Sequence, residues 1–67
     1  MYVIQVRSQH NDRLLAVRTI AQPATAVFRQ QIAFDASKEF NDDTYVAEFE
    51  VDASGNRELL NKYEFCY

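Results

Sequence analysis

One helical segment lies between two pairs of alternating segments, and this pattern limits the possible folds more than any other feature. The segment PATAVFRQQIAFDASKEF carries an apolar residue at every fourth position: Ala24, Phe28, Ile32, Ala36 and Phe40. That spacing predicts one apolar stripe along a helix of roughly four to five turns. Pro23 suits the first helical turn, and Asn41 can end the helix in a left-handed conformation.

The residues before the helix predict a β-hairpin. YVIQVRS alternates with a period of two, and RLLAVRTI is a second strand rich in apolar residues. A two-residue turn within QHND would pair Val6 with Leu15 on the face that the helix covers. A shift by one residue would instead turn Ala16 and Arg18 inward, so the first register is favoured.

The residues after the helix predict a second hairpin. In TYVAEFEVD one face carries Tyr45, Ala47, Phe49 and Val51, and the other carries Val46, Glu48, Glu50 and Asp52. A three-residue loop at residues 54–56 would place Val51 opposite Leu59 and Glu48 opposite Lys62. The aromatic face is therefore predicted to lie under the helix.

The sequence thus predicts a single α+β domain over residues 1–67. Its strands form a four-stranded antiparallel sheet in ββαββ order, with one helix packed on one face. The opposite face is predicted to stay open and to mix apolar with charged residues: Val3, Gln5, Arg7, Leu14, Ala16, Arg18, Ile20, Val46, Glu48, Glu50, Asp52, Leu60, Lys62, Glu64 and Cys66. An apolar patch with a polar rim is typical of an interface. Val27 and Phe34, seven residues apart on the helix, could offer a second contact surface.

The charges divide unevenly between the two halves of the chain. Residues 1–34 carry four arginines and one aspartate, whereas residues 35–67 carry three cations and nine carboxylates. Seven carboxylates gather in the second hairpin and the turn before it: Asp42, Asp43, Glu48, Glu50, Asp52, Glu58 and Glu64. Such a cluster repels itself unless a basic surface neutralises it.

These observations predict a protein-binding module without enzymatic activity. The seven carboxylates would dock on a basic, nucleic-acid-binding surface of a larger protein, with Val46 and Leu60 as apolar anchors. One alternative is a homodimer through the open sheet face, acting as an antitoxin-like or adaptor subunit. Another is a weak nucleic-acid-binding domain that uses Arg7, Arg13 and Arg18, although three arginines make a thin phosphate footprint.

No catalytic, metal-binding or cofactor-binding set is apparent in the sequence. Ser8, His10 and Asp12 share one tight turn that gives a nucleophile no scaffold, and one histidine with one cysteine cannot form a zinc site. The lone Cys66, and an N-terminal MYVIQVRS without a basic leader or a long apolar run, predict a reducing cytoplasm rather than secretion or a membrane.

In size, acidity and order of elements the chain resembles the small phage-encoded inhibitors of bacterial defence, in particular the anti-CRISPR proteins. The resemblance covers the whole chain but rests on no motif, so no functional residue is carried over. It implies a bacterial host cytoplasm. It also implies that the carboxylates occupy phosphate-binding lysines or arginines of a surveillance complex.

Overall fold

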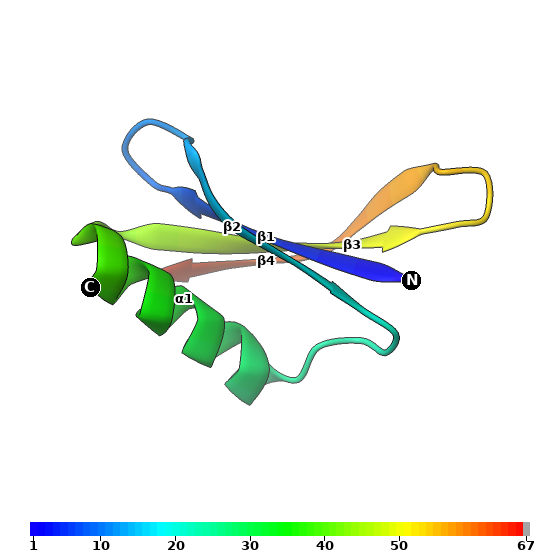
Figure 1. The fold of residues 1–67 in the computed structure, drawn as a ribbon, viewed down its shortest axis with the longest axis horizontal. Coiled ribbons are helices and arrows are strands. Elements are labelled where there is room, and N and C mark those ends of the chain that lie inside the picture. The colour runs from blue at the N-terminus through cyan, green and yellow to red at the C-terminus, as the bar shows by residue number, and fades with distance from the viewer. Residues whose placement is uncertain (67) are drawn as a thin grey trace.

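A computed structural model describes residues 1–66 and confirms the predicted α+β fold (Figure 1). The elements follow in the order β1 (Tyr2–Ser8), β2 (Leu14–Ile20), α1 (Ala26–Phe40), β3 (Thr44–Val51) and β4 (Arg57–Phe65). The four strands form one antiparallel sheet in the order β2-β1-β3-β4, so the two hairpins meet through β1 and β3. The helix covers one face of this sheet.

Helix α1 begins three residues later than the predicted start at Pro23. Thr25 is extended, and its hydroxyl accepts the Phe28 N–H at 3.1 Å, which satisfies one of the free donors of the first turn. The predicted end is confirmed, because Asn41 adopts the left-handed conformation with φ 52° and its N–H reaches the Ser37 carbonyl. The helix is therefore capped by its own sequence at both ends.

The core lies between α1 and the two central strands. Its buried members are Ile4, Val6, Ile32, Ala33, Ala36 and Val46. Ala33, Ala36 and the buried Ser37 present small side chains to the sheet, so the helix lies close to it. The Ser37 hydroxyl hydrogen-bonds the Thr44 hydroxyl of β3 at 2.8 Å, which joins helix and sheet inside the core.

The predicted register of the first hairpin is wrong beyond its first pair. Arg7 pairs with Leu14 as the prediction requires, but the ladder then shifts and Val6 pairs with Ala16. The cause is a β-bulge at Leu15 of β2, opposite the step from Val6 to Arg7. One extra residue reverses the side-chain alternation of β2, so Ala16 rather than Leu15 faces the helix.

The second hairpin also departs from its predicted register. Val51 pairs with Arg57 rather than with Leu59, so the connecting loop has five residues. Asp52 sets this loop, because its Oδ1 accepts the N–H groups of Ser54 at 2.9 Å and Asn56 at 3.0 Å. A bulge at Leu60 then moves Glu48 opposite Asn61 rather than Lys62.

The two faces of β3 are exchanged relative to the prediction, and its pairing with β1 shows this. Val6 pairs with Val46 and Ile4 pairs with Glu48 across the β1–β3 ladder, and paired residues share a face. Val46 and Glu48 therefore lie under the helix. The predicted core face of β3, with Tyr45 and Phe49, is instead the open face of the sheet.

The turns of both hairpins lie on the side of the sheet away from α1 (Figure 1). They stand at opposite ends of the longest axis of the chain, whose extents are 36 × 24 × 16 Å. The open face of the sheet therefore lies between two raised turns.

Candidate functional site

Glu48 is the most deeply buried charged side chain, with only 1% of its surface exposed. Its Oε1 lies 3.2 Å from Arg29 Nη1 and accepts the Asn61 amide at 3.3 Å, and its Oε2 accepts the Ala24 N–H at 2.9 Å. Arg29 Nη1 also donates to the Ala24 carbonyl at 2.8 Å. These hydrogen bonds and the ion pair connect the start of α1 to β3 and β4.

The prediction that Glu48 and Val46 contact a partner is therefore wrong. Glu48 is buried and paired with Arg29, and Val46 is a core residue with 1% exposure. Neither side chain can reach a partner in this fold. Sequence reasoning missed the role of Arg29, although the helical stripe already placed that residue beside Phe28 near the start of the helix.

Asp42 and Asp43 hold the junction between α1 and β3 against the first turn. Ser8 Oγ donates to Asp42 Oδ2 at 2.6 Å, and His10 Nε2 lies 3.3 Å from Asp42 Oδ1. The same His10 nitrogen lies 3.6 Å from Asp43 Oδ2, and the Asp43 carbonyl accepts the Gln9 N–H. These two carboxylates thus take part in contacts within the chain itself.

Three acidic residues around the turn of the second hairpin form the group that we call the acidic tip: Glu50 in β3, Asp52 in the turn and Glu58 at the start of β4. Glu50 and Glu58 are exposed and stand directly opposite each other in the β3–β4 ladder. The three carboxylates line a shallow hollow with Asn56 and Arg57. Among the described lining residues, Arg57 supplies the one positive charge.

Two exposed leucines of β4 adjoin the acidic tip. Leu59 has 55% of its surface exposed and lies opposite Phe49 on the open face, and Leu60 has 39% exposed at the bulge. The structure thus keeps Leu60 accessible, as the sequence predicted, whereas Leu59 projects from the face opposite to Glu50 and Glu58. Glu64 lies farther along β4, opposite Tyr45 and away from the tip.

The open face carries a polar group around Tyr45. Its hydroxyl donates to the Asp12 carboxylate, and Lys62 Nζ lies 4.6 Å from the centre of its ring. The hydrogen bond to Asp12, then burial and the negative charge of Asp12, raise the pKa of Tyr45, whereas Arg7 opposes the rise. This end of the open face therefore mixes both signs of charge and carries no acidic patch.

The centre of the open face is apolar. Val3 and Ala47 are almost covered by their neighbours on the sheet, Phe49 is half-buried, and Val17 is 43% exposed. No helix of residues 1–66 covers this face, as predicted, but the predicted apolar patch is wrong in large part, because Val3 is buried and Val46 lies under the helix. Ala16 and Ile20, assigned to this face from the sequence, pack against the core instead.

The predicted basic patch does not form on one face. Arg7 pairs with Leu14 and Tyr45 on the open face, whereas Arg18 pairs with Ile4 on the helix side. Arg7 is also occupied by Gln5 and by the Asp12 carbonyl. Arg7 and Arg18 thus cannot contact one phosphate backbone together.

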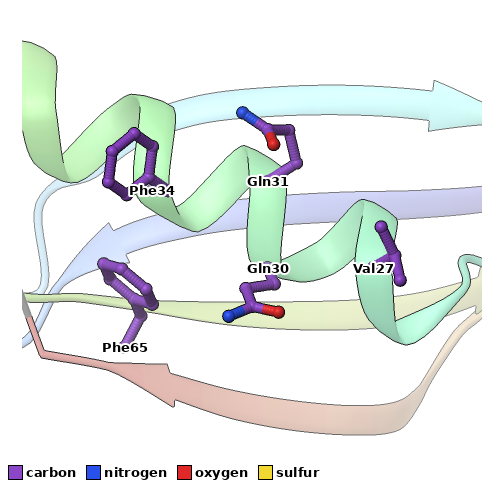
Figure 2. Close-up of a pocket in the computed structure, with 5 residues that line it drawn as sticks. All are labelled: Val27, Gln30, Gln31, Phe34 and Phe65. Carbon is purple, nitrogen blue, oxygen red and sulfur yellow. The ribbon is translucent and has the colours of Figure 1, made fainter.

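A second hollow, of about 170 Å³, lies between α1 and the edge strand β4 (Figure 2). Phe34 meets Phe65 edge-on, with ring centres 6.1 Å apart at an interplanar angle of 89°. Gln30 and Gln31 also line the hollow, and Val27, 76% exposed, lies at its other end. Both helix positions singled out from the sequence, Val27 and Phe34, therefore border this hollow.

Ser8 and His10 both contact Asp42, whereas Asp12 lies against Tyr45. The hydroxyl of Ser8 donates to Asp42 and the carboxylate of Asp12 accepts from Tyr45, so these side chains do not converge on His10. Within residues 1–66 no three histidine, cysteine or acidic residues are arranged to hold a metal ion. Every buried side-chain nitrogen or oxygen in that range has a hydrogen-bond partner.

No family model, curated protein or solved structure matches the chain. Among the described residues, no helix has the length and apolar character needed to cross a membrane.

Proposed function

We propose that the protein is a non-enzymatic binding module whose acidic tip docks on a basic surface of a larger protein. Glu50, Asp52 and Glu58 supply the charge, and Leu60, exposed at the bulge of β4, supplies apolar contact. Charge of this kind sets the rate and orientation of encounter, whereas buried leucines slow dissociation. The contact set is smaller than the sequence predicted, because Val46 and Glu48 are buried.

The facing pair Glu50–Glu58 is the observation that carries this proposal. Like charges directly opposite each other in an antiparallel ladder lower stability, by an amount of about 0.2–1 kcal/mol. Neither carboxylate has an ion pair within hydrogen-bonding distance among the described side chains. A basic partner would neutralise both carboxylates on binding. The pair is therefore unfavourable in the free protein but favourable in a complex.

The Glu50→Lys variant tests this proposal because folding and binding should respond in opposite directions. It replaces a repulsive cross-strand pair by an attractive one, so the free energy of unfolding should rise by about 0.5 kcal/mol. Capture of partner proteins from a bacterial lysate by the immobilised variant should nevertheless fall about tenfold or more. Glu39→Lys, an equal charge change on the exposed end of α1, is the matched control and should retain capture.

A partner that binds the wild type and Glu50→Lys equally well would overturn the proposal. The predicted nature of the partner is tested in the same experiment. A captured protein that binds DNA or RNA should lose nucleic acid as the wild-type chain is added. An anti-CRISPR-like role predicts, in particular, that a surveillance complex fails to bind target DNA.

A further inference from the structure

Strand β4 has a free edge along nine residues. It ends the sheet and pairs only with β3, and all of its residues except Phe65 are exposed. Such an edge presents N–H and C=O groups that can pair with a further strand. The acidic tip includes the start of β4, but the proposed docking leaves this backbone edge unused.

The charges of β4 alternate in sign along the strand. In chain order they are Arg57, Glu58, Lys62 and Glu64. The bulge at Leu60 places Arg57, opposite Val51, on the same open face as Glu64, opposite Tyr45. The two ends of the strand thus carry opposite charges on the same face.

We propose that two copies of the chain associate through their β4 edges, antiparallel, with Arg57 of each copy opposite Glu64 of the other. This register forms two ion pairs on the open face, one on either side of a twofold axis. It sets the bulge of one copy beside that of the other. The result is a continuous eight-stranded sheet with both helices on one face.

Neighbouring registers fit less well. A shift of one residue in either direction sets open-face side chains opposite helix-face side chains, because the bulge has reversed the alternation. A shift of two residues places Arg57 opposite Lys62 of the second copy, which is repulsive. The opposite shift of two leaves Arg57 without a charged partner. Side-chain direction and charge therefore select the same register.

The helix face of β4 also fits a second copy. In the proposed register Asn56 of the second copy comes opposite Phe65, whose ring borders the hollow between α1 and β4 (Figure 2). Gln30 offers an amide partner there, whereas the Gln31 amide donates to Asp35 at 2.9 Å. A strand laid along β4 would thus lie next to the hollow and bring a polar side chain to the Gln30 amide.

The other edge of the sheet gives no such match. Strand β2 carries Arg18 as its single charged residue, so two antiparallel copies of β2 form no ion pair in any register. Of the two sheet edges, only β4 can therefore form ion pairs with the same edge of a second copy. The association extends the proposed function but does not depend on it, because Glu50 and Asp52 stay outside the β4 edge.

Sedimentation velocity over protein concentrations of about 1 to 200 µM tests the proposal by mass action. The wild type should form a dimer, and Arg57→Glu or Glu64→Arg alone should raise its dissociation constant about tenfold or more. The double variant Arg57→Glu with Glu64→Arg should restore it to within about threefold, since the two ion pairs are re-formed with reversed polarity. The matched control exchanges Lys38 and Glu39 on α1 and should leave the dimer unchanged.

Hydrogen exchange gives a second measurement that a change of fold cannot imitate. In the dimer, amides along β4 should be protected relative to those of β2, and Arg57→Glu should remove that protection while circular dichroism stays native. A monomer at every concentration overturns the proposal. So does a dimer that resists Arg57→Glu but dissociates on Val17→Glu, because it would form through the open sheet face. Loss of capture in Glu50→Lys with an intact dimer would separate this proposal from the docking function.

Discussion

Replacement of Glu48 by alanine tests the central physical claim about this fold. Glu48 is 1% exposed and accepts from Arg29, the Ala24 N–H and Asn61, so its removal leaves three donors without their acceptor. Removal of one member of a buried ion pair costs about 3–5 kcal/mol. Because the Arg29 side chain is 20% exposed and can recover some water, we expect the lower end of that range, about 3 kcal/mol.

The assay is urea unfolding followed by circular dichroism at 25 °C. A domain of this size has a total stability of roughly 3–10 kcal/mol, so the loss from Glu48→Ala should be visible as an early transition or an unfolded baseline. Glu39→Ala, an exposed glutamate on α1, is the control and should stay within about 0.5 kcal/mol of the wild type.

A double-mutant cycle then separates the ion pair from the rest of the network. Glu48→Met with Arg29→Met removes both charges and keeps apolar volume, so the double variant should be more stable than Glu48→Met alone. The reasoning is refuted if Glu48→Ala costs less than about 1 kcal/mol, or if the effects at Glu48 and Arg29 simply add.

Three further predictions concern Tyr45, the N-cap of α1 at Thr25 and the hairpin turn at Gly55. Asp12→Ala should lower the raised pKa of Tyr45 in a spectrophotometric titration. In the wild type, the stability that this raised pKa contributes is present below pH 10 and is lost as the pH rises through the folded value, so the stability advantage of the wild type over Asp12→Ala should shrink over that range. Thr25→Ala removes the N-cap of α1 and should cost about 1 kcal/mol in urea unfolding, whereas Thr25→Ser should be nearly neutral. Gly55→Ala should cost about 1 kcal/mol through backbone strain alone, because φ is +86° and an added Cβ meets no atom within 4 Å; an unchanged midpoint would contradict this.

The order and type of the elements could be predicted because each depends on a repeated local pattern. Alternation over seven to nine residues specifies a strand, and a four-residue repeat with Asn41 at its end specifies a helix and its stop. These patterns tolerate an error of one residue at any single position. The predicted fold class is correct for that reason.

The strand registers could not be predicted because each depends on a single residue. The bulges at Leu15 and Leu60 each insert one residue into a ladder, and one residue is enough to exchange the faces of a strand. The small residues Ala33 and Ser37 bring α1 close to the sheet. The smaller side chains Thr44 and Val46 of β3 fit beneath the helix there. The aromatic Tyr45 and Phe49 therefore lie on the open face.

The candidate site was predicted in part for the same reason. Glu50, Asp52, Glu58 and Leu60 are exposed as expected, since residues next to a hairpin turn stay near the surface in either register. Glu48 lies two residues farther from the turn and is buried. Its partner Arg29 follows Phe28 by one residue and so lies off the apolar stripe, which gave no sequence signal for a buried ion pair.

The burial of Glu48 shows that the carboxylates in the acidic half of the chain have two different roles. Asp42 and Asp43 contact the first turn and Glu48 neutralises Arg29, so these three carboxylates hold the fold together. The charge left for a partner is concentrated at one end of the longest axis, where Glu50 faces Glu58. A charge placed at one end orients the whole molecule on encounter, whereas a charge spread along a strand would not. The burial of Glu48 therefore narrows the proposed docking surface to the exposed carboxylates, and it separates them from the carboxylates that contact other parts of the chain.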